Sequence, residues 1–146
     1  MRIIIFVVNY VCSIPENLTI MPYEATIEPF EDYIRVELSG DRKPGHEVND
    51  AVQAGRQIMA ACRSHGVNKL LMIFKMTGRL PATDAHEIYS NPEEYGWSRD
   101  IKVAVVDENP ESQEDSLFSE TVAVNRAYNT CVFENETEAR EWLLDK

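Results

Sequence analysis

Apolar and polar positions alternate in two short segments near the start of the regular part of the chain. The alternation runs over 23–30 and again over 33–38, and the residues between, 29–32, have the composition of a turn. In the second segment the apolar side chains would point to one face, and Arg35 and Glu37 to the other. The pattern predicts an antiparallel hairpin.

A helix is predicted over 47–65, because apolar residues recur there at helical spacing and Gly66 can end it. Gly55 lies on the apolar side, where its missing side chain would let a neighbouring element approach closely, at a cost of about 1 kcal/mol in helix propensity. This side consists of Val48, Val52, Gly55, Ile58, Met59 and Cys62.

The segment 67–74 contains an unbroken apolar run at 70–74, and 101–106 is apolar except for Lys102. Both are typical of parallel strands that are covered on both faces. We expect loops after them, at 75–81 and 107–115. A helix is predicted over about 84–90, with Thr83 or Asp84 as its cap, and another over 117–128. The side chains predicted to face inward from the latter are Leu117, Phe118, Thr121, Val124 and Tyr128.

The tail combines a strand at 130–133 with a final helix. Asn135 followed by Glu138 is the pattern of a helix N-cap with a reciprocal acceptor. The side chains expected to dock this helix are Ala139, Trp142 and Leu143. The element order is then β-β-α-β-α-β-α-β-α, which predicts an α/β fold with a mixed sheet, an N-terminal antiparallel hairpin, parallel C-terminal strands and four helices.

Residues 1–20 precede this pattern, and we treat them as an extension of a single domain at 21–146. The run at 3–12 is almost wholly apolar and rich in β-branched residues, and it is too short to cross a bilayer as a helix. We expect an ordered strand that is buried, at a contact in a homodimer. The alternatives are a non-native start upstream of Met21, or a secretion or anchoring segment, although no small-x-small cleavage site precedes Pro15.

Composition narrows the class of protein. A chain of 146 residues with 44% apolar residues is the size of one domain with a proper core. Its 25 acidic residues against 14 basic ones give a net charge of −11, which disfavours binding to nucleic acids and to anionic membrane surfaces. Cys12, Cys62 and Cys131 are odd in number and form no CxxC pair, which fits a cytoplasmic protein without a disulfide framework.

Several of these segments together resemble the SpoIIAA-like family, small bacterial proteins related to STAS domains. Their fold is also similar to the CRAL-TRIO lipid-carrying domain. The resemblance covers roughly 23–144, and its strongest piece is the closing pattern Phe133-x₅-Ala139-x-x-Trp142-Leu143. The resemblance implies a regulatory or ligand-carrying protein that is not an enzyme.

The resemblance to STAS domains also raises a phosphoregulated switch as an alternative. STAS antagonists carry a phosphorylatable residue in an Asp-Ser-x-Gly type turn at the start of a helix. The nearest counterpart is Thr77, which has a glycine directly after it, but no acid precedes it and Pro81 interrupts the segment beyond. A phosphate on Thr77 would add about two negative charges beside Lys75 and Arg79.

No spacing typical of a metal site or a catalytic site is present in the sequence. His86-Glu87 lacks the second histidine of a zinc motif, because position 90 is serine. The acidic segment 107–115 contains Pro110 and no glycine, unlike a calcium loop. We therefore predict no catalytic residue, metal or cofactor, although an enzyme with a dispersed site would leave no local signature.

The candidate binding site is the segment 76–97, which comes after a predicted parallel strand. Ligands of such sheets bind beyond the carboxyl ends of the strands. The candidate ligand-binding residues are Met76, Leu80, Tyr89, Tyr95 and Trp97. Their apolar and aromatic character suits a pocket for a small lipid-like ligand, a surface for a partner protein, or simple cover for the sheet.

Overall fold

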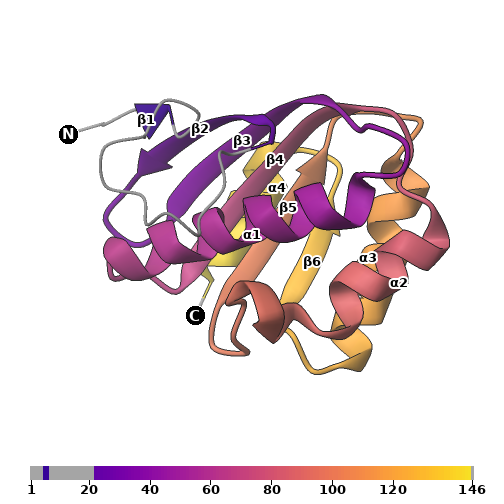
Figure 1. Cartoon of the computed structure of the whole chain (residues 1–146). Helices are drawn as coiled ribbons and strands as arrows, with labels where there is room; N and C mark the ends of the chain where they lie inside the picture. The colour runs from indigo at the N-terminus through magenta and orange to yellow at the C-terminus, as the bar shows by residue number, and fades with distance from the viewer. Residues whose placement is uncertain (1–4, 7–21, 146) are drawn as a thin grey trace.

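The protein is described here by a computed structural model that covers residues 5–6 and 22–145 (Figure 1). One sheet holds all the strands of this part, in the order β1-β2-β3-β4-β5-β6. The strands are β1 (Ile5–Phe6), β2 (Glu24–Pro29), β3 (Ile34–Asp41), β4 (Lys69–Thr77), β5 (Lys102–Asp107) and β6 (Thr130–Phe133). The helices are α1 (Glu47–Ser64), α2 (Ala82–Ser90), the 3₁₀ helix η2 (Pro92–Tyr95), α3 (Gln113–Asn125) and α4 (Glu136–Leu144). The predicted α/β class and mixed sheet are confirmed.

The sheet is antiparallel at its N-terminal edge and parallel elsewhere. β2 and β3 form the predicted hairpin, with Ile27 opposite Val36. From β3 onward each strand pairs in parallel with the next along the chain, and Leu70 of β4 lies opposite Val103 of β5. The predicted parallel pairing of these two apolar segments is therefore confirmed.

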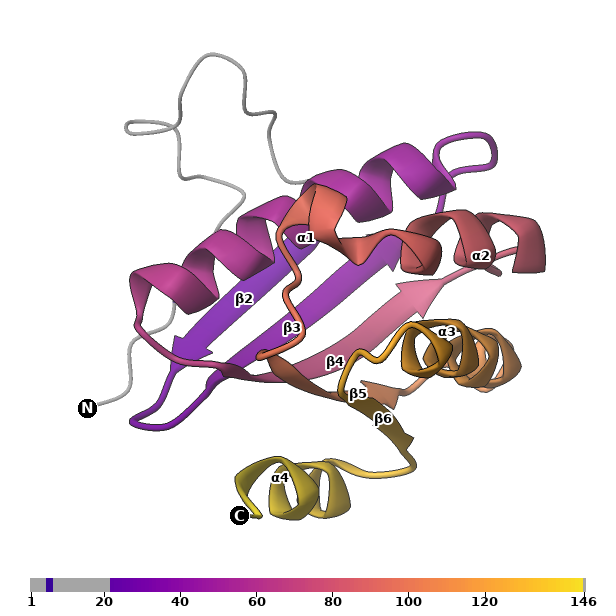
Figure 2. The ribbon, with the colours of Figure 1, turned by 90° about the horizontal axis from the view of Figure 1, so that it is seen from below.

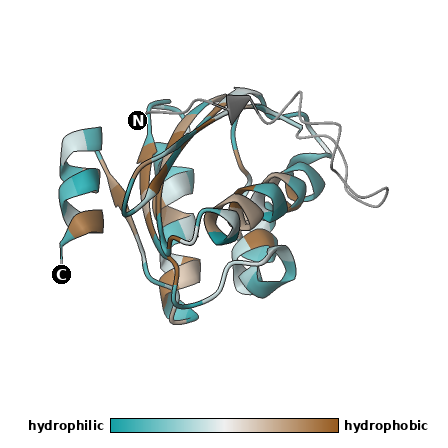
Figure 3. Ribbon diagram, turned by 90° about the vertical axis from the view of Figure 1, so that its left-hand side faces the viewer, coloured by the Kyte–Doolittle hydropathy of each residue, from teal (hydrophilic) through white to brown (hydrophobic). Residues whose placement is uncertain are grey.

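Helices cover both faces of the sheet, in unequal numbers. Because the parallel strands succeed one another in chain order, right-handed crossovers bring every connecting helix to the same face. α1, α2 and α3 lie on that face, and α4 lies on the opposite face (Figures 2 and 3). The three connecting helices enclose most of the apolar core, while Ala139 and Leu143 of α4 pack on a smaller cluster around Leu71 and Ile73.

The terminal helix α4 is anchored as the sequence predicts. The Asn135 side chain accepts a hydrogen bond from the backbone N–H of Glu138 at 2.9 Å, which caps the helix. Ala139 and Leu143 are fully buried. Trp142 is half-buried, and the Lys102 ammonium lies 4.3 Å from the centre of its ring.

The inward face of α3 differs from the prediction. Leu117, Phe118 and Val124 are 51%, 40% and 48% exposed. Thr121 is also exposed, so among the predicted residues only Tyr128, beyond the end of the helix, is buried. The buried residues of α3 are the small ones, Ser119, Val122 and Ala123. The prediction relied on the large apolar side chains, whereas the helix turns its small ones toward the sheet.

Two element boundaries also differ from the predictions. β4 continues through Thr77, because β3 extends to Asp41 and pairs with it there, so 75–77 is strand rather than loop. α2 begins at Ala82, after Pro81, and no side chain caps it; the predicted cap at Thr83 or Asp84 is wrong. The extended conformation of Pro81 sets the start of the helix directly.

The predicted N-terminal strand at 3–12 lies mostly outside the described residues. Within it, Ile5–Phe6 pairs antiparallel with β2 at the edge of the sheet, Ile5 opposite Ile27. The expected burial and dimer contact of this segment, and the alternatives that involve Met21, concern residues outside the described part. None of the described helices has the length and apolar character needed to cross a membrane.

A charge network joins the hairpin to α4 on the outer face of the sheet. The Arg35 guanidinium donates to both carboxylate oxygens of Glu136, at 2.8 and 2.9 Å, and to Glu37 at 2.8 Å. Lys75 of β4 lies 2.6 Å from the other oxygen of Glu37. Since Glu136 is the first residue of α4, this network fixes the start of that helix against β3.

Because of this network, the stability of the fold should depend on pH in the acid range. The Lys75 ammonium and then Arg35 lower the pKa of Glu37, and Arg35 lowers the pKa of Glu136. Carboxylates with lowered pKa values stabilise the fold at pH above about 4.3, the ordinary value, and lose this contribution as the pH falls. We expect the melting temperature to drop below about pH 4. In Glu136→Gln this drop should be shallower, whereas the exposed control Glu141→Gln should match the wild type; equal curves for all three would contradict the network.

Candidate functional site

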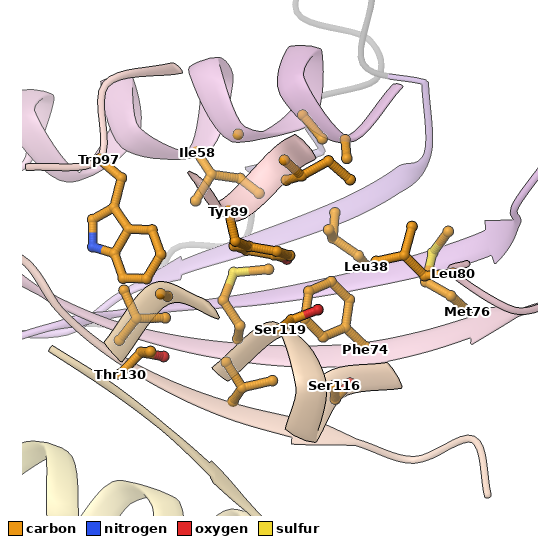
Figure 4. A pocket seen from close by; sticks show the side chains of 18 of the residues that line it. Leu38, Ile58, Phe74, Met76, Leu80, Tyr89, Trp97, Ser116, Ser119 and Thr130 are labelled. Atoms are coloured by element: carbon orange, nitrogen blue, oxygen red, sulfur yellow. The ribbon is translucent and has the colours of Figure 1, made fainter. Parts of the chain in front are cut away.

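All five residues predicted to bind a ligand line one cavity of about 130 Å³ on the three-helix face. Met76, Leu80, Tyr95 and Trp97 are buried, and Tyr89 is half-buried. Figure 4 shows Tyr89 in the middle of the cavity, with Trp97 at one end and Leu80 and Met76 at the other. The structure therefore brings together residues that span the end of β4, α2, η2 and the loop after it.

The floor of the cavity is the parallel sheet. Alternation along each strand places every second side chain on this face. The apolar floor residues are Leu38, Leu70, Met72, Phe74, Met76, Val103, Val105 and Val132. A surface of this kind favours apolar ligand atoms.

Small side chains of α1 and α3 line part of the cavity beside larger ones. α1 contributes Ala51, Ala54 and Gly55 together with the larger Ile58 and Met59, and α3 contributes Ser116, Ser119 and Ala123. Where the side chains are small, space remains above the sheet between the two helices. The residues of α3 were missed from the sequence, because the predicted inward face was the opposite one.

The two serines add little polarity to the cavity wall, since their hydroxyls are already bonded. Ser119 donates to the backbone oxygen of Asp115 at 2.9 Å, and Ser116 donates to the Asp107 carboxylate at 2.6 Å. Asp107 is itself buried and also accepts from Ser112 at 2.8 Å. The acidic segment after β5 is thus an internally bonded turn.

Trp97 forms a rigid end wall. Its indole N–H donates to the backbone oxygen of Ile101 at 3.1 Å, and its ring packs against Tyr128 with the ring centres 4.8 Å apart. Because the indole donor is bonded on this side, Trp97 offers the cavity only its apolar ring.

Tyr95 is the polar exception in this wall. Its side chain is 5% exposed, and its hydroxyl has no hydrogen-bond partner among the described residues. Its ring lies so close to α1 that a Cβ atom on Gly55 would come within 2.7 Å of it, which confirms the predicted close approach at Gly55. Leaving a buried hydroxyl unpaired costs about 1–3 kcal/mol.

Burial keeps the phenols of the cavity protonated. It raises the pKa of Tyr23 to about 12, raises the pKa of Tyr89, and raises the pKa of Tyr95 well above its ordinary value. All three phenols are therefore neutral at physiological pH, and each hydroxyl can donate a hydrogen bond.

Charged groups lie at the edge of the cavity, where their hydrogen bonds and ion pairs join neighbouring elements. The Asp115 carboxylate accepts two hydrogen bonds from Arg79, both 2.9 Å, and one from the backbone N–H of Leu80 at 3.0 Å. Arg79 accordingly lowers the pKa of Asp115. Arg42 donates to the backbone oxygen of Gly78 at 3.0 Å. These contacts fix the β4–α2 connection against α3 and so hold Leu80 over the cavity.

Thr77, the phosphorylation candidate, lies outside the cavity at the exposed end of β4. Its hydroxyl donates to the Asp41 carboxylate on the neighbouring strand. The two cations expected to receive a phosphate are already paired, Lys75 with Glu37 and Arg79 with Asp115. A phosphate on Thr77 would instead meet a carboxylate.

In the part of the chain that the structure describes, no three or more His, Cys, Asp or Glu side chains are grouped as a metal site. Cys62 is fully buried, and burial raises the pKa of its thiol to about 12, so it remains an unreactive thiol. Cys131 is half-buried.

Comparison with known proteins gives no relative for this arrangement: no protein-family model, no curated protein and no solved structure matches the chain.

The contact between Gly55 and Tyr95 can be tested by Gly55→Ala. Helix propensity alone favours alanine by about 1 kcal/mol, but a methyl group 2.7 Å from the Tyr95 ring overpacks the site. We expect a net loss of about 1–2 kcal/mol in the free energy of unfolding, measured by urea denaturation. In a Tyr95→Val background the same change should be neutral or stabilising; a stabilised Gly55→Ala single variant would contradict the contact.

Proposed function

We propose that this protein is a non-enzymatic binding module that holds a small apolar ligand in the cavity between the sheet and α1, α2 and α3. One observation carries the proposal: a space of about 130 Å³ with mostly apolar walls remains open between the sheet and the helices, beside small side chains such as Gly55, Ser119 and Ala123. An unfilled apolar space costs stability, since its lining atoms lose packing partners. A ligand of matching size would restore those contacts.

The volume favours a compact ligand. A cavity of about 150 Å³ lined by apolar side chains holds a benzene-sized molecule, whereas sites for drug-sized ligands measure roughly 300 Å³ or more. The present cavity of about 130 Å³ belongs with the former. A long acyl chain would require the helices to move apart, so we favour a single-ring ligand over an extended lipid.

We also propose that the domain at 21–146 is SpoIIAA-like. The supporting features are the N-terminal antiparallel hairpin, the parallel strands in chain order, and the terminal helix alone on the second face. The closing pattern from Phe133 to Leu143 supports it too, because Ala139 and Leu143 are fully buried and Phe133 packs against Trp142 with ring centres 5.5 Å apart. A ligand-carrying role is one that this resemblance implies.

A partner protein is the second candidate, and the outer face of α3 favours it. Leu117, Phe118 and Val124 are exposed and lie along one side of that helix. Exposed apolar side chains gathered in this way are a common feature of protein-binding surfaces. The five candidate residues of the cavity are too buried to form such a surface themselves.

Cavity binding can be tested by filling the cavity from within. Ser119→Leu adds apolar volume at a wall position whose hydroxyl bonds only to the backbone of its own helix. A panel of single-ring apolar compounds should raise the melting temperature of the wild type by several degrees at ten times the dissociation constant. The same compounds should not raise the melting temperature of Ser119→Leu. Without ligand, the melting temperature of this variant should be equal to or above that of the wild type.

Thr121→Leu is the matched control, because Thr121 lies on the exposed side of the same helix. It should respond to the panel as the wild type does. Native mass spectrometry of freshly purified protein gives a second readout, in which a retained small-molecule adduct is expected. A wild type with neither adduct nor ligand-dependent stabilisation would reject the proposal.

A further inference from the structure

Within the ligand role proposed above, on which this inference rests, we infer that the ligand is an uncharged ring compound with one carbonyl oxygen, and that the Tyr95 hydroxyl donates a hydrogen bond to that oxygen. Tyr95 would then provide the specificity for the ligand, while the apolar walls provide most of the affinity.

The hydroxyl of Tyr95 is the one buried side-chain polar atom without a partner in the described part of the chain. Two other polar groups of the wall do have hydrogen-bond partners. The Trp97 indole N–H donates to the backbone oxygen of Ile101, and the Ser119 hydroxyl donates to the backbone of its own helix. Native proteins rarely leave a buried polar atom unpaired, and an exception calls for a physical explanation. A single ligand atom that pairs with Tyr95 supplies that explanation.

The position of Tyr95 suits an anchor. Its ring is pressed against Gly55 on α1, and it ends the short helix η2, so it has little freedom to turn toward another partner. Tyr95 is one of the residues that line the cavity, as is Tyr89, which lies in the middle of it (Figure 4). The unpaired hydroxyl therefore belongs to a side chain of the cavity wall.

The chemistry of the wall selects a neutral acceptor. A phenol that stays protonated donates one hydrogen bond, and a carbonyl oxygen accepts it without bringing a charge into the cavity. An anionic ligand would meet three carboxylates at the cavity edge, those of Glu47, Asp115 and Glu120. The cations there are Arg42 and Arg79, and Arg79 is already paired with Asp115. A cationic ligand would lose its hydration among apolar side chains without gaining a buried carboxylate partner.

The test uses two probes of nearly equal shape. Acetophenone carries a carbonyl oxygen where α-methylstyrene carries a methylene group. Titration calorimetry on the wild type should give about tenfold tighter binding for acetophenone, as expected for one hydrogen bond that satisfies a buried donor. In Tyr95→Phe the preference for acetophenone should disappear or reverse, because its carbonyl oxygen would then be buried without a donor. α-Methylstyrene should bind at least as well as it does to the wild type.

Tyr89→Phe is the matched control, because it removes the other phenol of the cavity and should keep the preference for acetophenone. Equal affinities of the wild type for the two probes would overturn the role of Tyr95 and leave cavity binding intact. A preference that persists in Tyr95→Phe would overturn it too. Failure of both probes to bind the wild type would overturn this inference together with the proposed function. Benzoate binding more tightly than acetophenone would show that the cavity takes anions, against the inference.

Discussion

The strand order of the sheet is the constraint on which the rest of the structure depends. Because β3 to β6 pair in parallel and in chain order, their three connections must all cross on one face. Three helices and a 3₁₀ turn therefore share the area above four strands, while α4 alone covers the other side. The two faces of the sheet are consequently packed differently, one by three helices and the other by α4.

On the α4 face the problem is solved by close packing. Ala139 and Leu143 bury against Leu71 and Ile73, and the network around Arg35 holds the start of the helix. On the three-helix face, α3 turns small residues toward the sheet, α1 presents both small and large ones, and Tyr89 lies in the middle of the space that remains. The cavity and the unpaired hydroxyl of Tyr95 in its wall result from this arrangement. Binding, in our account, is a consequence of how the crowded face is packed.

Much of the fold could be predicted because its signals are local. Alternation at 33–38 and the apolar segments at 70–74 and 101–106 reflect the burial of individual strands. The cap at Asn135 depends on residues three apart. The five candidate residues were chosen because they follow a parallel strand, and they do line the cavity. The cavity itself lies over the face of the sheet, with Leu70 and Val103 in its floor, and not only beyond the carboxyl ends of the strands.

The rest could not be predicted, because it depends on contacts between elements. The end of β4 is set by its pairing with Asp41 of β3, and the inward face of α3 is the one that carries Ser119, Val122 and Ala123. A pattern of large apolar residues pointed to Leu117 and Phe118, whereas the sheet receives Ser119 and Ala123. The small side chains of α3 that line the cavity therefore could not be recognised from a single sequence.

Xenon is the most direct probe of the central claim that the space above the sheet is open, because it binds apolar cavities and requires no particular ligand chemistry. In a crystal structure determined under xenon pressure, the account predicts a xenon atom beside Tyr89, between α1 and α3 and above the floor of β4 and β5. A structure with no xenon there, and with the side chains of Tyr89 and Met72 filling the space, would contradict the account.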